Sequence, residues 1–482
     1  MLIKEKEQYR PRVHFAPQAN WINDPNGMVY FEGEYHLFYQ YNPNDTVWGP
    51  MHWGHAVSKD MVKWEELSIA LYPDQLGQIF SGSAVVDWDN TTGFFPEKPG
   101  LVAIFTHHQP GDHEHPDKQS QSIAYSHDRG RTWEKYHGNP VLTDDTLIDF
   151  RDPKVFWDQT RGLWIMVLAT GQSVRFYSSK NLKEWQFESQ FGDDRGYQKG
   201  VWECPDLFQL PVEGSDKTRW VLLVSVGDNP EYQTGSKTQY FVGEFDGKTF
   251  KPEHVDVRWL DHGKDNYAGV SFSDIPSNDG RRIYMGWMSN WRYANQVPTK
   301  GWRGQMTFPR CLSLQEHHGQ CMIRQLPVKE IERYARQVSM IDRKRIEPSQ
   351  PYHIKLDEGC VDVKLKLDIA RAQLLILTCK HTADQETIIT FNGSTQEVSL
   401  QRQDYSHGKL PDLFEATQSM PFYGNPELNI RLIIDAASIE LFTDDGLQAL
   451  TSLIYPDQPC QELVITSQNG DTQLLSGQVS IL

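Results

Sequence analysis

A short motif recurs four times in the first 250 residues, and it constrains the fold more than any other feature of the chain. Ser58-Lys-Asp-Met-Val-Lys-Trp64 is echoed at residues 126–133 and 178–185, and more loosely at 244–250. The closing aromatic residues of successive copies lie 69, 52 and 65 residues apart. Each copy has the pattern of a strand, a tight polar turn and a second strand that opens with a ring. One such hairpin per unit, with room for roughly four strands, indicates the blades of a β-propeller.

The sequence around the motif agrees with this interpretation. Residues 10 to 325 are dense in short β-like runs such as 101–106, 163–169 and 220–226, which are broken by Gly, Pro, Asn and Asp. No helical period competes with these runs. A region of this length at this spacing predicts five blades. The alternative, a β-sandwich, would have shorter repeats.

The texture changes after residue 325. Residues 326–337 have an amphipathic pattern with a proline near the start, which predicts a helix between two domains. Residues 361–369 then alternate cleanly between apolar and polar, and residues 438–446 run into an Asp-Gly turn with a return strand at 448–454. We therefore predict an all-β protein with a five-bladed β-propeller at 1–325, a helical linker at 326–345 and an antiparallel β-sandwich at 346–482.

Charge and composition narrow the classes of function. The chain has 482 residues and a formal net charge of −17, so its surface repels nucleic acid and anionic membranes, and neither is an expected partner. Six scattered cysteines without a CxxC pair are expected to be free thiols. The start MLIKEKEQYRPRVHF has no apolar core, and no run approaches 18 apolar residues. The simplest expectation is a cytoplasmic protein, or a secreted one if a leader had been trimmed. The oligomeric state stays open.

Three acidic residues of the propeller region lie in unusual settings. They are Asp24 in Trp21-Ile-Asn-Asp-Pro-Asn-Gly27, Asp152 in Arg151-Asp152-Pro153, and Glu203 in Trp202-Glu203-Cys204-Pro205-Asp206. Glycoside hydrolysis needs two carboxyl groups in different states, one ionised to attack the anomeric carbon and one protonated to donate to the leaving oxygen. Neighbouring N–H groups could keep Asp24 ionised, an adjacent guanidinium could do the same for Asp152, and an apolar wall could raise the pKa of Glu203.

Each box alone has a simpler explanation, because Asp-Pro-Asn-Gly is usually a plain turn and Arg-Asp-Pro is usually a surface ion pair. Glu203 alone could be a solvent-facing residue at a strand end. The spacing of the boxes adds information. In a propeller the start of each innermost strand faces the central channel, so acidic residues at equivalent positions of different blades converge on one funnel.

These boxes resemble glycoside hydrolase family 32, the invertases, levanases and exo-inulinases. The chain also carries Phe38-Tyr39-Gln40, Trp48-Gly-Pro-Met-His-Trp-Gly-His55 and Phe80-Ser-Gly-Ser-Ala84, and the resemblance covers nearly the whole chain. It implies a five-bladed propeller followed by a β-sandwich. It further implies Asp24 as nucleophile, Glu203 as general acid/base and Asp152 as transition-state stabiliser, with no cofactor and no metal.

The resemblance also implies the residues that hold the substrate. Those expected to enclose the terminal fructose are Asn23, Gln40, Trp48, Phe80, Ser81 and Arg151. Tyr267 and Trp287 are candidate sugar platforms, with packing in the propeller core as the alternative. The segment Gly286-Trp-Met-Ser-Asn-Trp-Arg-Tyr-Ala-Asn-Gln-Val-Pro298 resembles the levanase and exo-inulinase branch more than the sucrose-6-phosphate hydrolases.

The expected function is therefore a retaining exo-β-fructosidase that hydrolyses terminal non-reducing β-D-fructofuranosyl residues of fructans, fructo-oligosaccharides and sucrose. The alternatives are an intracellular invertase or sucrose-6-phosphate hydrolase and, more remotely, a non-catalytic sugar-binding propeller. One further cluster, His107, His108, His113 and His115, matches no strong metal-ligand spacing and is expected to be a solvated loop at the funnel rim.

Overall fold

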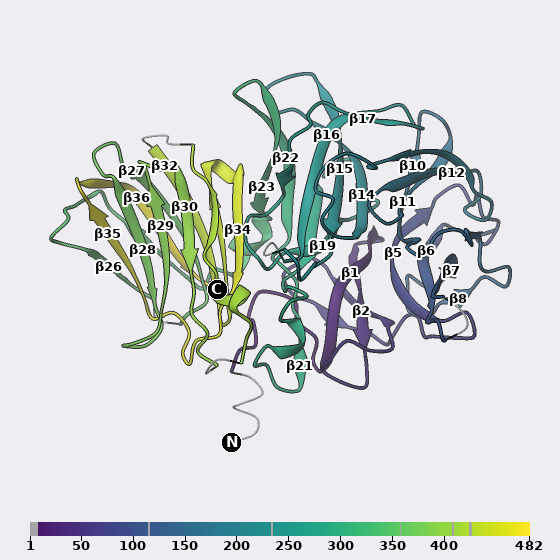
Figure 1. Ribbon diagram of the computed structural model, residues 1–482, viewed down its shortest axis with the longest axis horizontal. Helices are drawn as coiled ribbons and strands as arrows, with labels where there is room; N and C mark the ends of the chain where they lie inside the picture. The colour runs from purple at the N-terminus through teal and green to yellow at the C-terminus, as the bar shows by residue number, and fades with distance from the viewer. Residues whose placement is uncertain (1–7, 114–115, 233–234, 357, 407–408, 424–426) are drawn as a thin grey trace.

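The computed structural model describes residues 8–482 except 114–115, 233–234, 357, 407–408 and 424–426. Five small sheets are arranged around an axis on one side of the molecule, and two larger sheets are stacked on the other side (Figure 1). This architecture confirms the predicted all-β class, with a five-bladed propeller followed by a β-sandwich. None of the helices in the described part of the chain is long and apolar enough to cross a membrane.

The strands of the five blades follow the chain in order. The first blade contains β1 (Asn20–Phe31), β2 (Glu34–Asn42), β3 (His52–Ser58) and β4 (Glu65–Glu66), with β21 (Trp302–Arg303) paired to β1. The second contains β5 (Gln78–Asp87), β6 (Gly100–Gln109), β7 (Lys118–Ser126), β8 (Glu134–Lys135) and β9 (Leu142–Thr143). The third contains β10 (Arg151–Asp158), β11 (Leu163–Ala169), β12 (Val174–Ser179) and β13 (Gln186–Phe191). The fourth contains β14 (Trp202–Pro211), β15 (Thr218–Val226), β16 (Lys237–Phe245), β17 (Phe250–Pro252) and β18 (Arg258–Trp259). The fifth contains β19 (Tyr267–Ser271), β20 (Arg282–Trp287), β22 (Arg310–His317) and β23 (Gln320–Pro327).

The repeated sequence motif is a repeated structural turn that joins the third strand of a blade to the fourth. A serine hydroxyl accepts a backbone N–H within the turn, from Met61 to Ser58 (2.7 Å), from Gly130 to Ser126 (2.8 Å) and from Leu182 to Ser179 (2.9 Å). The closing indole then donates to the carbonyl of the same residue, from Trp64 (2.9 Å), Trp133 (3.0 Å) and Trp185 (3.1 Å). The pattern is visible in the sequence because every partner lies within a few residues.

The innermost strands form a closed ring. Each of β1, β5, β10, β14 and β19 contacts the next, and β19 contacts β1. The short strand β21 pairs in parallel with the start of β1, Asn20 opposite Trp302, so the two ends of the propeller sequence meet in the first blade. The ring therefore brings the starts of five strands, which lie far apart in the sequence, around one axis.

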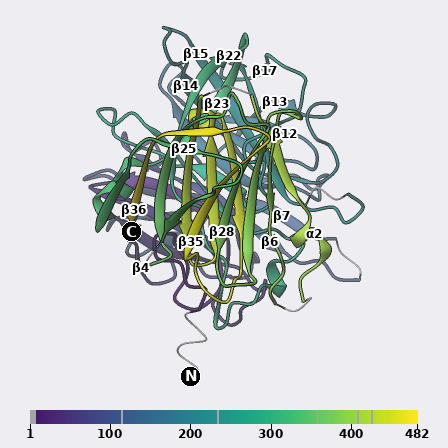
Figure 2. The same cartoon turned by 90° about the vertical axis from the view of Figure 1, so that its left-hand side faces the viewer.

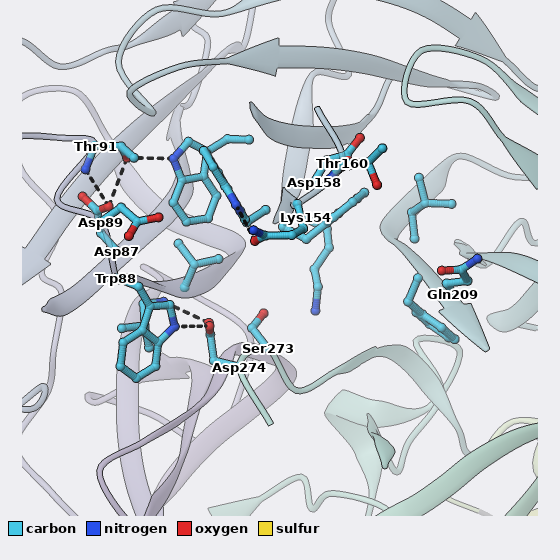
Figure 3. A pocket seen from close by; sticks show the side chains of 18 of the residues that line it. Asp87, Trp88, Asp89, Thr91, Lys154, Asp158, Thr160, Gln209, Ser273 and Asp274 are labelled. Atoms are coloured by element: carbon cyan, nitrogen blue, oxygen red, sulfur yellow. Dashed lines mark hydrogen bonds between the residues drawn. The ribbon is translucent and has the colours of Figure 1, made fainter. Parts of the chain in front are cut away.

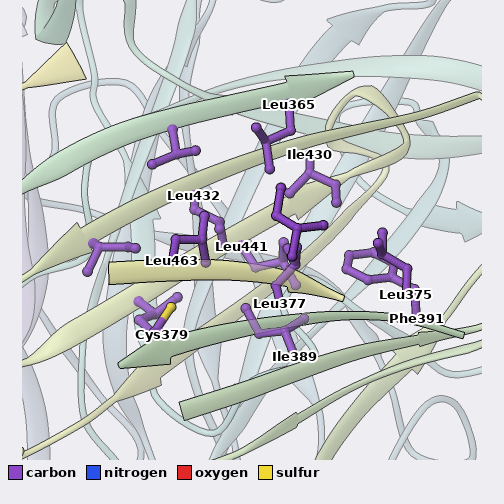
Figure 4. Close-up of a cluster of buried hydrophobic side chains, with 14 of the residues drawn as sticks. Leu365, Leu375, Leu377, Cys379, Ile389, Phe391, Ile430, Leu432, Leu441 and Leu463 are labelled. Carbon is purple, nitrogen blue, oxygen red and sulfur yellow. The ribbon is translucent and has the colours of Figure 1, made fainter. Parts of the chain in front are cut away.

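The second domain is a two-sheet sandwich. One sheet contains β24 (Gln337–Ile341), β25 (Lys344–Ile346), β36 (Thr472–Ile481), β27 (Val361–Asp368), β32 (Glu427–Asp435), β33 (Ser438–Thr443) and β34 (Gln448–Leu453). The other contains β26 (Tyr352–Lys355), β35 (Glu462–Gln468), β28 (Leu374–Lys380), β29 (Glu386–Asn392), β30 (Glu397–Gln401) and β31 (Gln418–Pro421). Alternate residues of the two inner faces, among them Leu365, Leu377, Ile389, Leu432 and Leu441, form one buried core (Figure 4). The short helices are η1 (Ala294–Gln296), η2 (Lys329–Tyr334), α2 (Asp412–Glu415) and η3 (Asp444–Gly446).

The predicted helical linker is wrong in type and extent. Only η2 is helical, and it is a single 3-10 segment. The chain before it still belongs to the last propeller strand, β23, and the chain after it forms β24 and β25 on the edge of a sandwich sheet. The amphipathic pattern reflects the burial of Val328 and Ile331. A longer helix does not form, because the chain from Gln337 onward pairs with β36 as strand β24.

Buried ion pairs fasten the sandwich to the propeller. The Arg310 guanidinium of β22 contacts Asp261 at 2.8 Å and reaches across to Glu440 of β33 at 2.5 Å, and none of these side chains is more than 2% exposed. In the opposite direction, Arg402 of the sandwich pairs with Asp265 and lies 3.8 Å from the ring centre of Phe414. The sandwich, which faces the viewer in Figure 2, therefore lies against the fourth and fifth blades through specific charged contacts.

Candidate active site

The innermost strand of every blade carries a β-bulge at the same level, near its start. The strand register shifts between Ile22 and Pro25, Ile79 and Gly82, Arg151 and Lys154, Glu203 and Asp206, and Tyr267 and Val270. A bulge interrupts the alternation of side chains and re-aims those that it contains. The residues skipped by the five bulges include Asp24, Ser81, Asp152 and Cys204. The same kind of β-bulge, one in each of the five innermost strands, therefore positions the site residues.

Three of these bulges place a non-glycine residue in the left-handed region, Asp152 (φ 64°), Cys204 (φ 47°) and Ala268 (φ 54°). They occupy matching positions in the third, fourth and fifth blades. Left-handed conformations are unfavourable for such residues and persist where the surrounding fold imposes them. Three strained backbone positions therefore border the end of the channel where the acidic residues meet.

Asp24 is held by hydrogen bonds to both carboxylate oxygens. The Ser81 hydroxyl donates to Oδ2 at 2.7 Å and the Asn23 amide donates to Oδ1 at 3.0 Å. Asn23 is itself oriented by the Trp21 indole N–H, at 2.8 Å. These donors favour the ionised carboxylate, as the sequence predicted. Burial and the nearby charge of Glu203 outweigh them, however, and the pKa of Asp24 is raised above its ordinary value.

Asp152 lies deeper, with a second set of partners. Its Oδ2 accepts the backbone N–H of Cys204 at 2.9 Å, and its own N–H donates to Thr106 at 3.0 Å. The Cys204 thiol lies between the two aspartates, with its sulfur 3.4 Å from Asp24 Oδ2 and 3.6 Å from Asp152 Oδ2. Burial raises the pKa of this thiol, so it remains a neutral donor. Burial also raises the pKa of Asp152 to about 7, although the charge of Arg151 opposes that rise.

Glu203 is partly exposed, with a quarter of its side chain accessible. The Arg151 guanidinium donates to its Oε1 at 2.9 Å, and the Tyr267 hydroxyl donates to its Oε2. The expected apolar wall is therefore replaced by two polar contacts. Arg151 is also arranged differently from the prediction, since its Nε is 3.9 Å from Asp152 while its closer partners are Glu203 and Asp149. The bulge at Asp152 turns adjacent side chains toward different neighbours.

The electrostatics of the cluster suit a reaction that needs one proton. Three carboxyl groups share a largely buried space with a single guanidinium, and the pKa values of two of them are raised. Asp24 and Asp152 interact as they titrate, and with the pKa of Asp152 at about 7 this pair holds part of a proton near neutral pH. A site with one protonated and one ionised carboxyl is what acid-assisted displacement at a sugar carbon requires.

Below the acids the channel is closed by a buried polar layer. Lys154 donates to the backbone carbonyl of Ser271 and lies 3.5 Å from Asp206. Ser271 N–H donates to Asp206 at 2.6 Å, and Ser83 donates to the carbonyl of Pro153 at 2.9 Å. These residues come from four innermost strands and are at most 5% exposed. The site is a funnel with a floor and not an open channel.

The upper wall contains the predicted pocket residues of the first two blades. Gln40 is buried and donates to the carbonyl of Ile79 at 3.0 Å. Phe80 is partly buried and stacks on His108, with ring centres 4.2 Å apart. Trp48 lies further out, 42% exposed, with its ring centre 6.3 Å from that of Phe80 and its backbone N–H bonded to Asn295. An aromatic and amide wall therefore borders the side of the funnel where Asp24 lies.

Tyr267 and Trp287 do not offer ring faces to a ligand. Both are fully buried. The Tyr267 ring lies in the core, and only its hydroxyl is directed to the site, at Glu203. Trp287 packs behind Trp21 and Trp291, at ring-centre distances of 5.8 and 4.8 Å. The alternative considered from the sequence, packing in the propeller core, is the arrangement observed, and the partly buried Trp291 is the ring of this segment nearer the surface.

The histidine cluster is also different from the expected solvated loop. His107 and His108 belong to β6 and are buried, the first bonded to Ser122 at 2.7 Å and the second stacked on Phe80. His113 is exposed, and His115 lies outside the described residues. In the part of the chain that the structure describes, no three His, Cys, Asp or Glu side chains are grouped as metal ligands.

Sequence reasoning missed several residues that contact the site. Cys204 was part of a box but had no role, and Asp149 and His108 were not assigned to the site. A strand without a bulge would point Glu203 and Cys204 in opposite directions, so nothing in the sequence indicated that both contact the cluster. Only proximity to the Arg-Asp-Pro box could have suggested Asp149.

A five-bladed propeller whose innermost strands bring three carboxyl groups together has the acid pair that a glycoside hydrolase requires. Residues 14–325 match the Glycosyl hydrolases family 32 N-terminal domain, and residues 329–481 match the Glycosyl hydrolases family 32 C terminal. The chain therefore belongs to glycosyl hydrolases family 32, which confirms the resemblance seen in the sequence.

Similar proteins were found by sequence and by structure. The chain is 46% identical to a levanase of Bacillus subtilis over 480 residues, which cover 98% of this chain and 70% of that protein. It is 34% identical to an extracellular exo-inulinase of Aspergillus awamori over 511 residues, covering 97% of this chain and 93% of the other. The structure of a fructofuranosidase from Schwanniomyces occidentalis complexed with fructose superposes with a TM-score of 0.88, at 32% identity and 99% coverage of both chains.

Proposed function

We propose that this protein is a retaining exo-β-fructosidase, which releases terminal β-D-fructofuranosyl residues from fructans, fructo-oligosaccharides and sucrose. The observation that carries the proposal is the convergence of Asp24, Asp152 and Glu203 at the closed end of one funnel. Family membership supports the reaction class. The levanase, exo-inulinase and fructofuranosidase relatives support the fructose-containing substrate.

The three acids have distinct roles in this proposal. Asp24 attacks the anomeric carbon of the terminal fructose while the bond to the leaving oxygen breaks, and Glu203 gives that oxygen its proton. Glu203 then takes a proton from water, which attacks the same carbon and releases fructose from Asp24. The two displacements retain the configuration. This mechanism expects the carboxyl groups of Asp24 and Glu203 to be about 5–5.5 Å apart.

Asp152 stabilises the transition state. Its bonds to Cys204 N–H and to the Cys204 thiol hold the carboxylate beside Asp24, where positive charge develops on the sugar ring. Arg151, held by Asp149 and Glu203, is placed to bind sugar hydroxyls and to orient the proton donor. With Asn23, Gln40, Trp48, Phe80 and Ser81 these residues enclose one fructose ring.

The closed floor supports exo action. The layer formed by Lys154, Asp206 and Ser271 prevents a polysaccharide from threading through the propeller, so only a chain end can reach the acids. An endo-acting enzyme requires a groove that is open at both ends. Fructose is therefore released one unit at a time.

Arg292, the cation expected near the leaving sugar, does not favour a phosphorylated substrate. Arg292 is the one strong cation in the segment that follows Trp291 up to Lys300. Its Nε and one terminal nitrogen both bind the Asp228 carboxylate, at 2.8 and 2.7 Å, and it also bonds the carbonyls of Asn229 and Tyr232. A guanidinium neutralised in this way has little charge to offer a phosphate. This observation argues against the alternative of a sucrose-6-phosphate hydrolase.

Parallel rate measurements test the proposal. We expect kcat/KM for 1-kestose and levanbiose to exceed that for sucrose 6-phosphate, with sucrose also cleaved and β-fructofuranose released first in early NMR spectra. A tenfold preference for sucrose 6-phosphate would promote the alternative, and initial release of the α-anomer would exclude the retaining mechanism. A protein that binds these sugars without cleaving them would be the non-catalytic propeller.

A further inference from the structure

A cavity lies at the other end of the propeller axis, away from the acids. It has a volume of about 740 Å³, which suits a small-molecule ligand. Its walls come from the far ends of the strands that build the active site, including Val85–Asp87 of β5, Phe156–Asp158 of β10 and Leu207–Gln209 of β14. No step of the proposed reaction uses these residues.

The cavity is separate from the active-site funnel. On β5 and β14 the first lining residue follows the active-site residue by four positions, from Ser81 to Val85 and from Glu203 to Leu207, whereas on β10 the wall begins at Lys154, two positions after Asp152. At about 3.3 Å per residue, four positions on β5 or β14 span about 13 Å along the strand. The buried layer of Lys154 and Asp206 lies between them, and Lys154 forms part of both the funnel floor and the cavity wall.

An aromatic platform stands at the cavity. Trp88, directly after β5, is 56% exposed, yet it is fixed in place. Its indole N–H donates to Asp274 at 2.8 Å, and its ring packs edge-on against Phe31 with a ring-centre distance of 5.9 Å. Figure 3 shows Trp88 and Asp274 on one side of the open space, with Gln209 on the opposite side. Two further indoles, Trp157 and Trp220, line the cavity and are partly exposed.

Polar groups with unused bonding capacity surround these rings. The Arg282 guanidinium donates to the Ser271 hydroxyl (3.4 Å) and the Phe272 carbonyl (3.2 Å) and lies 5.0 Å from the ring centre of Phe208, and none of the described carboxylates forms an ion pair with it. The exposed side chains of Asp89 and Gln209 add acceptors, and the Gln209 amide also donates to the Thr218 hydroxyl at 2.7 Å. Asp206 Oδ1, fully buried in the layer beneath, has no partner among the described residues. Fixed ring faces bordered by mixed donors and acceptors match the two surfaces of a sugar, its C–H face and its hydroxyls.

We propose that this cavity is a second, non-catalytic saccharide site, which anchors the enzyme to a neutral fructose polymer. The inference rests on the proposed function, because that function supplies the polymer. An anionic ligand fits less well, since the four lining carboxylates Asp87, Asp89, Asp158 and Asp274 outnumber the two lining cations. Because the two sites open on opposite faces, the second site holds another branch or a neighbouring chain and raises the local concentration of chain ends.

Kinetics on a polymer and on a trisaccharide separate the two sites. We expect Trp88→Ala to raise KM for levan by about threefold to tenfold, the effect of losing one stacked ring. Hydrolysis of 1-kestose, which reports on the funnel, should stay as in the wild type. Trp88→Tyr keeps a ring and should recover part of the loss. Phe187→Ala removes a comparably exposed ring from β13, away from the cavity, and is the matched control.

A binding measurement tests the site without turnover. In a native gel containing levan, we expect Asp24→Asn to be retarded more than the double variant Asp24→Asn/Trp88→Ala, because only the former keeps the second site. Thermal unfolding curves establish that both variants are folded. Equal retardation of the two, or an unchanged ratio of levan to 1-kestose KM in Trp88→Ala, would overturn the second site. A second outcome would also overturn the saccharide site: calorimetry in which Trp88→Ala abolishes binding of inorganic phosphate, together with levan binding that Trp88→Ala leaves unchanged. Failure of the proposed function has a different signature, because the wild type would then release no fructose from 1-kestose.

Discussion

The pH dependence of stability can be predicted from one buried histidine between the domains. His14 is fully buried, and its two ring nitrogens lie 2.8 Å from Asp435 and 2.8 Å from Glu440, both on the sandwich. Glu440 also binds Arg310 of the propeller, and the ring of Phe308 stands edge-on to the imidazole at 6.0 Å. Burial alone would lower the pKa of His14, but the bonds to the two carboxylates raise it from 6.5 to about 9.

The sign and size of the effect follow from linkage. A pKa raised in the folded state contributes stability that is complete below pH 6.5 and is lost as the pH rises through 9. The shift corresponds to about 3 kcal/mol. At about 2.1 cal/mol/K of unfolding entropy per residue, a chain of this length loses about 3 °C in Tm for that free energy. The pKa of Asp435 is lowered to about 2, with burial opposing and the bond to His14 favouring the shift, so its contribution is lost only in acid.

The assay compares thermal unfolding of the wild type and His14→Gln at pH 6, 7, 8, 9 and 10. The comparison is needed because Lys237 and Lys264, whose pKa values burial lowers to about 8, titrate in the same range with the opposite sign. They cancel in the difference between the two proteins. We expect the Tm advantage of the wild type to shrink by about 3 °C between pH 6 and pH 10. A difference that stays constant over that range would refute the charged histidine.

The remaining predictions concern catalysis. Asp24→Asn should lower kcat on 1-kestose by at least about 10⁴-fold. Glu203→Ala should lose less activity on a fructoside whose leaving group departs without a proton than on 1-kestose. Equal losses on the two substrates would show that Glu203 is not the proton donor. Asp152→Asn should lower kcat by about 10²–10³-fold with little change in KM, and an effect confined to KM would make Asp152 a binding residue. Initial rates should be unchanged in EDTA, because Glu203 protonates the leaving oxygen, and a reversible loss would point to a metal.

The architecture could be predicted from the sequence because the sequence patterns that indicate it arise from contacts between residues close together in the chain. The turn that closes on Trp64, Trp133 and Trp185 is held by bonds that span only a few residues, so the pattern of residues and the structure coincide. The same holds for the sandwich strands, where alternation along β27 and β29 is the alternation of buried and partly buried residues in the structure. Four copies of one hairpin motif, at their spacing, were enough to predict a propeller, and the acidic boxes were enough to indicate the family.

The residues that contact each acid could not be predicted from the sequence. The contact of Arg151 with Glu203 spans 52 residues and that of Cys204 with Asp24 spans 180, and both depend on bulges that reverse the expected direction of a side chain. The raised pKa of Asp24, the burial of Trp287 and the loss of the linker helix have the same origin. A pKa, a buried face or an edge-strand pairing is a property of groups that meet only after the chain has folded. The sequence therefore identified the three acids, and the tertiary structure decided what each of them touches and which other residues join them.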